Sequence, residues 1–240
     1  MEIIEPNITQ DEKKLPRLIS IEGNIGVGKT TLMDNLELYY KINNVKNVKI
    51  MREPIDEWLS YVDSKDNENI LTKFYNNPKK YSFLFQILIL KTNLQVLQDF
   101  MESCHNCDLI ICERSILSSR HVFTKMLYDG SYMDELEYKI YESLFDDWVN
   151  SEIFTPQKIV YLDVSPDISY SRIKKRSRTG EIVTSDYIIS CGLYHKTWLE
   201  NITDIEVMTL NCDNDVIYNL DDENNEGFQW INKIVNFSCV

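Results

Sequence analysis

An apolar segment that runs directly into a glycine-rich loop constrains the fold of this chain more than any other feature. Residues 17–31 read RLISIEGNIGVGKTT, in which Gly23, Gly28, Lys29 and Thr30 fit the pattern G-x-x-x-x-G-K-[ST]. In this pattern the glycines let backbone N–H groups face phosphate oxygens, the lysine reaches the β- and γ-phosphates, and the hydroxyl binds Mg²⁺. A helix that begins at about Lys29 adds the partial positive charge of its N-terminus. The segment therefore predicts a strand, a phosphate-binding loop and a helix that hold a nucleoside triphosphate.

The whole loop and the first helical turn are expected to contact the donor phosphates. A chance glycine-rich turn is the alternative, but a β-branched segment precedes the loop and a helical pattern follows it. The predicted phosphate-binding residues are Gly23, Asn24, Ile25, Gly26, Val27, Gly28, Lys29, Thr30 and Thr31.

Apolar stretches alternate with helical patterns along the rest of the chain. Five stretches indicate buried parallel strands, at about 17–22, 47–52, 108–112, 157–164 and 205–210. Long helices are expected over Lys79–Met101 and over about 133–151, and a loop over 212–227. This order predicts a doubly wound α/β fold, a five-stranded parallel sheet flanked by helices. Its 240 residues suit a single domain, 1–240, with a flexible N-terminal arm over 1–16.

Composition excludes several classes of function. The net charge of −13 argues against a surface that binds duplex nucleic acid, because such a surface needs excess Lys and Arg. The chain has no apolar run of about 18 residues and no secretory leader, so neither a membrane partner nor secretion is expected. Six cysteines are too few for a disulfide scaffold, which predicts a reducing, cytoplasmic location. Cys104 and Cys107 form one CxxC pair, but no second pair completes a zinc site.

Residues that follow the second and third predicted strands narrow the class of P-loop protein. A GTPase would carry an Asn-Lys-x-Asp loop that reads guanine, and the sequence contains none. Glu53 follows the second strand, and Glu113 and Arg114 follow the third. Ligands of open α/β sheets bind at the carboxyl ends of the strands, so these residues should converge on the phosphate loop. A carboxylate there can accept a hydroxyl proton or hold a metal-bound water.

Five segments together resemble the animal-type deoxynucleoside kinase family, which includes deoxycytidine, deoxyguanosine and mitochondrial thymidine kinases and the insect multisubstrate enzyme. The similarity covers about residues 17–235, and it implies the P-loop kinase fold of the family. Each segment alone is weakly specific, but all five occur in the order of the family. They are Gly23–Thr30, Glu53–Trp58, Tyr81–Gln86, Glu113–Ser115 and Arg172–Arg178 with a downstream Tyr187.

The resemblance implies an ATP- and Mg²⁺-dependent transfer of phosphate to the 5′-hydroxyl of a deoxynucleoside, in nucleotide salvage. Glu53 resembles the general base that accepts the hydroxyl proton. Arg114 resembles the residue that holds both the 5′-oxygen and Glu53, and Glu113 the one that orients Mg²⁺ through water beside Thr30. The alternatives are a solvated carboxylate for Glu53 and a structural ion pair for Glu113 and Arg114.

The basic segment resembles the arginine-rich lid of the family. Phosphoryl transfer needs charge stabilisation on the transferring oxygens, which suits such a lid. Arg172 and Arg176 lie four residues apart in sequence and can share one helix face, and Arg178 follows two residues later; a solvated basic face is the alternative. Together with Lys29, Arg176 and Arg178 are the implied catalytic cations. Arg172, Arg176 and Asp215 are the implied contacts to the donor nucleotide.

The implied acceptor pocket contains residues from several segments. Gln86 would read the base edge, because an amide offers both a donor and an acceptor. Two aromatic rings would enclose the base, and Tyr75 with Glu181 would bind the 3′-hydroxyl. Any of the aromatic residues could instead belong to the core. The implied pocket residues are Ile55, Trp58, Leu71, Tyr75, Phe85, Gln86, Arg114, Ser119, Phe123 and Glu181.

Two positions depart from the pattern of deoxycytidine and deoxyguanosine kinases. Those enzymes pair an Arg with an Asp where this chain has Asn93 and Ser119, and Ile89 is closer to the thymidine-accepting members. Without the charged pair the pocket should admit a 5-methyl group, which favours thymidine and deoxycytidine.

Two further readings remain open at this point, as does the oligomeric state. A thymidylate-type nucleotide kinase would need an extra Arg clamp for a phosphorylated acceptor, and a nucleotide-binding regulatory module would not need Glu53. The long helices and the family suggest a homodimer.

Overall fold

A computed structural model describes residues 15–103, 107–149, 154–176 and 182–239. Of the expected N-terminal arm, residues 1–14 lie outside the described residues. Cys104, Arg178 and Glu181 also lie outside them.

A five-stranded parallel sheet forms the centre of the fold. Its strand order is β2–β3–β1–β4–β5, and every neighbouring pair is parallel. The bounds are Arg17–Gly23 for β1, Val48–Met51 for β2, Leu109–Glu113 for β3, Lys158–Asp163 for β4 and Glu206–Asn211 for β5. Each predicted strand is confirmed to within one residue at either end. The fold prediction of an α/β protein with a five-stranded parallel sheet is also confirmed.

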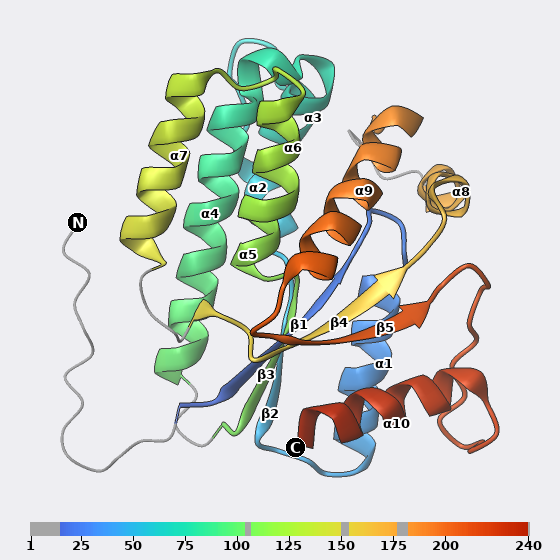
Figure 1. Ribbon diagram of the computed structural model, residues 1–240. Coiled ribbons are helices and arrows are strands. Elements are labelled where there is room, and N and C mark those ends of the chain that lie inside the picture. Colours follow the sequence, from blue (N-terminus) through green and yellow to red (C-terminus); the bar gives the residue numbers. More distant parts are fainter. Residues whose placement is uncertain (1–14, 104–106, 150–153, 177–181, 240) are drawn as a thin grey trace, which may run out of the picture.

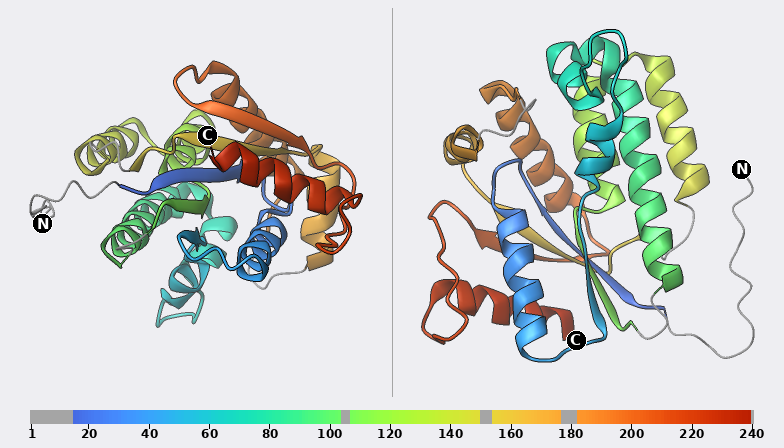
Figure 2. Two further views of the ribbon diagram at one scale, coloured as in Figure 1. Left: turned by 90° about the horizontal axis from the view of Figure 1, so that it is seen from below. Right: turned by 180° about the vertical axis from the view of Figure 1, so that it is seen from behind.

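Helices cover both faces of this sheet because its strands present apolar side chains alternately to each side. The helices α1 (Lys29–Ile42) and α10 (Glu226–Cys239) pack on the face that carries Ile19 and Ile21. The opposite face carries Leu18 and packs against α4 (Pro78–Ser103) and α7 (Glu135–Trp148), and further along against α9 (Ser185–Asn201). Figures 1 and 2 show these two helical layers with the sheet between them.

Shorter helices border the carboxyl ends of the strands. They are α2 (Ile55–Ser60), α3 (Ile70–Asn76), α5 (Ile116–Ser118), the π-helix η1 (Ser119–Thr124), α6 (Lys125–Asp129) and α8 (Pro166–Arg176). The helix expected over 133–151 begins two residues later than predicted. Asp134 caps it, and the Asp134 side chain and Glu137 form a reciprocal capping box. The described part of the chain contains no helix long and apolar enough to cross a membrane.

Candidate active site

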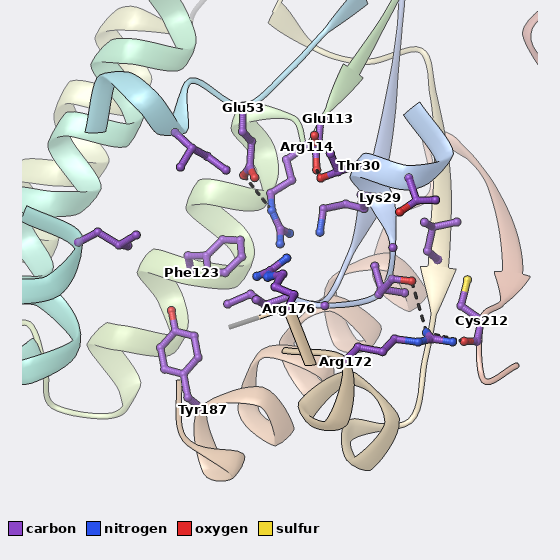
Figure 3. Close-up of a pocket in the computed structure, with 18 of the residues that line it drawn as sticks. Lys29, Thr30, Glu53, Glu113, Arg114, Phe123, Arg172, Arg176, Tyr187 and Cys212 are labelled. Atoms are coloured by element: carbon purple, nitrogen blue, oxygen red, sulfur yellow. Dashed lines mark hydrogen bonds and ion pairs between the residues drawn. The ribbon is translucent and has the colours of Figure 1, made fainter. Parts of the chain in front are cut away.

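A cleft of about 680 Å³ lies at the carboxyl ends of the strands (Figure 3). Most residues predicted for the site line it, although they come from segments far apart in the sequence. Those residues are Ile25, Gly26, Val27, Gly28, Lys29, Thr30, Thr31, Glu53, Ile55, Trp58, Leu71, Tyr75, Phe85, Gln86, Glu113, Arg114, Ser119, Phe123, Arg172, Arg176 and Asp215. Among the described residues, the predicted Gly23 and Asn24 do not line it.

Gly23 and Asn24 instead shape the phosphate loop from behind. Gly23 has a φ of +145°, and a Cβ there would lie 2.6 Å from the carbonyl oxygen of Leu162. The Asn24 side-chain amide donates to the Ile188 carbonyl at 2.9 Å, which ties the loop to α9. These two residues therefore set the path of the loop, and the following residues border the cleft.

Lys29 lies at the base of the loop. Its Nζ donates to the carbonyls of Gly23 at 3.1 Å and Asn24 at 2.9 Å. Burial lowers the pKa of Lys29 to about 8, and the nearby Arg114 acts in the same direction. Glu53 and Glu113 act in the opposite direction, and an anion bound in the loop would add to their negative charge.

Glu53 and Arg114 form an ion pair at the centre of the cleft (Figure 3). Arg114 Nε lies 2.9 Å from Glu53 Oε1, and the side chains are only 8% and 15% exposed, respectively. Arg114 also donates through Nη1 to the Gly23 carbonyl at 2.7 Å. Burial raises the pKa of the Glu53 carboxyl, although the charge of Arg114 opposes the shift. An enclosed carboxylate with a raised pKa is suited to accept a proton.

Thr30 and Glu113 meet beside this pair. The Thr30 hydroxyl donates to Glu113 Oε1 at 3.0 Å. Mg²⁺ is usually bound through one or two protein oxygens, with phosphates and waters completing its shell. This hydroxyl and carboxylate fit that donor set. Among the described residues, no group of three or more His, Cys, Asp or Glu side chains is placed to hold a metal ion.

The other end of the cleft is apolar and aromatic. Phe85 packs against Phe74 and Trp58 with ring centroids 5.0 and 5.8 Å apart. The Trp58 indole N–H donates to Thr92 Oγ1 at 2.8 Å, which fixes the plane of that ring. Gln86 is buried, and its Oε1 accepts from Thr124 Oγ1 at 3.3 Å.

Phe123 connects the apolar end of the cleft to the ion pair. The guanidinium of Arg114 lies 4.8 Å from the centroid of its ring. Phe123 and Ser119 lie in η1, and π-helical turns are frequent at functional sites. Ser119 and Ile89 line the cleft. Asn93 is buried and is not among the described residues that line it.

The two described lid arginines of α8 differ in direction. Figure 3 shows Arg176 pointing into the cleft, whereas Arg172 turns towards Cys212. Arg172 forms an ion pair with Asp215 at 2.8 Å and donates to the Cys212 carbonyl at 2.8 Å. Arg172 therefore joins α8 to the loop that follows β5, and that loop carries the predicted donor contact Asp215.

Some lining residues were not predicted. Phe74 lies one helical turn after Leu71, so helical spacing could have identified it as a neighbour on the same face. Tyr187 also lines the cleft, although the resemblance to the family implies no role for it. The donor end also includes Cys212, Tyr218 and Trp230, for which the sequence carries no local signal.

The CxxC motif of the sequence is only partly described. Cys107 is buried, and its thiol donates to the Leu109 carbonyl. Cys104 lies outside the described residues.

Comparisons with known proteins agree with this geometry. The family model of deoxynucleoside kinases matches residues 19–236. The chain is 33% identical over 214 residues to a probable deoxycytidine kinase of Fowlpox virus (strain NVSL), covering 87% of this chain and 83% of that protein. It is 29% identical over 225 residues to deoxycytidine kinase 1 of Xenopus laevis, covering 82% of each. It is also 29% identical over 195 residues to the human mitochondrial thymidine kinase 2, covering 81% of this chain and 68% of that protein.

The family match spans the phosphate loop, the Glu53–Arg114 pair and the strand ends that carry them. The chain therefore belongs to the deoxynucleoside kinase family.

Proposed function

We propose that this kinase transfers the γ-phosphoryl group of ATP to the 5′-hydroxyl of a deoxynucleoside in nucleotide salvage, and that it favours pyrimidines. The buried Glu53–Arg114 ion pair beside the phosphate loop is the observation that carries the proposal.

The acceptor hydroxyl would lie between the apolar pocket and the ion pair. Glu53 accepts its proton, and the hydroxyl oxygen forms a bond to the γ-phosphorus while the bond to the leaving ADP breaks. Arg114 holds Glu53 in place and faces the negative charge that develops on the reacting oxygens. Proton transfer to a positioned base typically contributes about 10²- to 10⁴-fold in rate.

The donor phosphates would lie against the loop and the N-terminus of α1. Gly28 caps α1 in a left-handed conformation, with a φ of +107° and no side-chain cap, so the first N–H groups of the helix are directed to a ligand. Lys29 and Arg176 supply cations on two sides of the cleft. Thr30 and Glu113 would hold Mg²⁺, which neutralises phosphate charge when it is bound.

The acceptor pocket supports a preference for pyrimidines. Ser119 is small and Ile89 is uncharged, so the described pocket wall offers no carboxylate–guanidinium pair at this end. The relatives named above include both deoxycytidine and thymidine kinases.

A homodimer is the proposed assembly. The helices α4 and α7 pack together and leave large apolar side chains exposed: Leu84 at 55%, Leu136 at 67% and Ile140 at 42%. Measuring the mass of the protein in solution by light scattering would test this assignment.

ADP release measured across the four deoxynucleosides and their 5′-monophosphates tests the proposed reaction. We expect turnover with thymidine and deoxycytidine, and none with the monophosphates, because the Glu53 carboxylate would repel a phosphate. Turnover with monophosphates alone would indicate a nucleotide kinase instead. Nucleotide binding without turnover would indicate a regulatory module.

A further inference from the structure

Glu22 is a fully buried carboxylate that the proposed reaction does not use. It lies near the end of β1 and is 0% exposed. Its Oε1 accepts two hydrogen bonds from Ser115, one from the backbone N–H and one from the hydroxyl, both at 2.7 Å. Its Oε2 has no partner among the described residues. Burying a carboxylate is costly, so this position calls for an explanation beyond packing.

The neighbour of Ser115 has an unusual backbone. Arg114 adopts a φ of +62°, in the left-handed region that residues with a side chain rarely occupy. Such conformations persist only where the surroundings hold them, and they gather at active sites. Hydrogen bonds on both sides of Arg114 are therefore needed to hold this strained backbone conformation.

The strand β1 supplies the acceptors of both hydrogen bonds. The Arg114 N–H donates to the Ile21 carbonyl at 3.1 Å, and the next N–H, that of Ser115, donates to the Glu22 side chain. The turn between them directs the Arg114 guanidinium back to the Gly23 carbonyl at 2.7 Å and to Glu53 at 2.9 Å. Three consecutive residues of β1 thus hold one arginine.

We propose that Glu22 is a positioning residue, which fixes the backbone turn at Arg114 and thereby the contact of Arg114 with Glu53. The inference rests on the proposed function, because it acts through the role assigned there to Arg114. Without the Glu22 carboxylate, the Ser115 N–H and hydroxyl would lose their acceptor, and the turn could relax.

A double-mutant cycle separates this role from general packing. Glu22→Ala, Glu22→Gln and Ser115→Ala are each made in the wild type and in Arg114→Ala. Ser20→Ala is the matched control, because Ser20 lies two residues earlier on the same strand, is equally buried, and has an Oγ without a partner among the described residues. The measurements are kcat, the KM values for thymidine and ATP, and the melting temperature.

We expect Glu22→Ala to lower kcat by about tenfold or more while the KM for ATP changes less than about threefold. Glu22→Gln should restore at least about a third of wild-type kcat, because its amide oxygen can accept both bonds. In Arg114→Ala, Glu22→Ala should change the residual kcat by less than about threefold. Ser20→Ala should leave kcat unchanged.

An equal loss from Glu22→Ala in both backgrounds, or a normal kcat in that variant, would overturn the inference. If Glu22→Ala does not fold, Ser115→Ala decides. A fall in kcat of about two- to fivefold in the wild-type background, with none in Arg114→Ala, supports the inference, and an equal fall in both backgrounds overturns it. If Arg114→Ala retains wild-type kcat, both the proposed role of Arg114 and the inference fail. A large loss in Arg114→Ala with additive Glu22 effects overturns the inference alone.

Discussion

The two ends of the cleft are built in different ways. The charged end is formed by the ends of neighbouring strands, and main-chain carbonyls hold its cations: both Lys29 and Arg114 donate to Gly23. The apolar end is formed by separate helices: Trp58 packs against Phe85 and its indole donates to Thr92, while Phe123 lines the cleft from η1. The sheet therefore fixes the proposed reacting groups, whereas separate helices form the proposed acceptor pocket.

Removing the proton acceptor from the charged end should have the largest effect. Glu53→Gln keeps the shape of the side chain and removes its basicity, so kcat should fall by about 10²-fold or more, with a modest change in nucleoside binding. Steady-state kinetics with thymidine measure this effect. The control is Asp56→Asn, which changes an exposed carboxylate nearby on α2. Turnover of Glu53→Gln within about threefold of wild type would refute the assignment of the base.

Changing the apolar end should alter the choice of substrate and leave the reaction intact. Asn93→Arg with Ser119→Asp introduces the Arg–Asp pair of the deoxycytidine and deoxyguanosine kinase pattern. The double change adds bulk at Ser119, which is only 4% exposed. Overpacking of this kind costs about 1 to 3 kcal/mol, so kcat/KM for thymidine should fall by roughly 5- to 150-fold. Deoxycytidine, which lacks the 5-methyl group, should lose less.

The values of kcat/KM for all four deoxynucleosides in both proteins check this prediction. A wild type that prefers purines, or a double variant with undiminished thymidine activity, would remove the pyrimidine assignment.

Loosening the loop that follows β5 should have a smaller effect. The Arg172–Asp215 ion pair joins α8 to that loop, but Asp215 is 77% exposed, and pairs of this kind contribute about 0 to 1 kcal/mol. Asp215→Asn should therefore raise the KM for ATP by no more than about fivefold, with little change in kcat. Asp221→Asn, an exposed residue further along the loop, is the control. A large fall in kcat would place Asp215 in the reaction itself.

The smallest expected signal is the uptake of a proton when ATP binds. The pKa of Lys29 is lowered to about 8 chiefly by burial, and bound phosphates would raise it. Near pH 8 the free enzyme should therefore take up about half a proton with ATP, and near pH 6 almost none. Calorimetry in buffers of different ionisation enthalpy measures this uptake. The same uptake in Lys29→Met would assign it to another group.

The difference between the two ends of the cleft also explains which parts of the fold and of the site could be predicted from the sequence. The strands, the phosphate loop and the positions of Glu53 and Arg114 follow from local patterns, because parallel strands bring their carboxyl ends to one edge. The left-handed turn at Arg114 has no sequence signal, since its anchors come from β1. Trp230 reaches the cleft only through the packing of the distant helix α10, which local spacing does not specify.

The dependence of kcat/KM on pH, compared between wild type and Glu53→Gln, tests the central claim most directly. Burial raises the pKa of Glu53 above its ordinary value of about 4.5, and the carboxylate must be unprotonated to accept the hydroxyl proton. We predict that kcat/KM of the wild type falls as the pH is lowered through this raised pKa. In Glu53→Gln this acid limb should be absent and activity low throughout. An acid limb of the same position and size in both proteins would contradict the account.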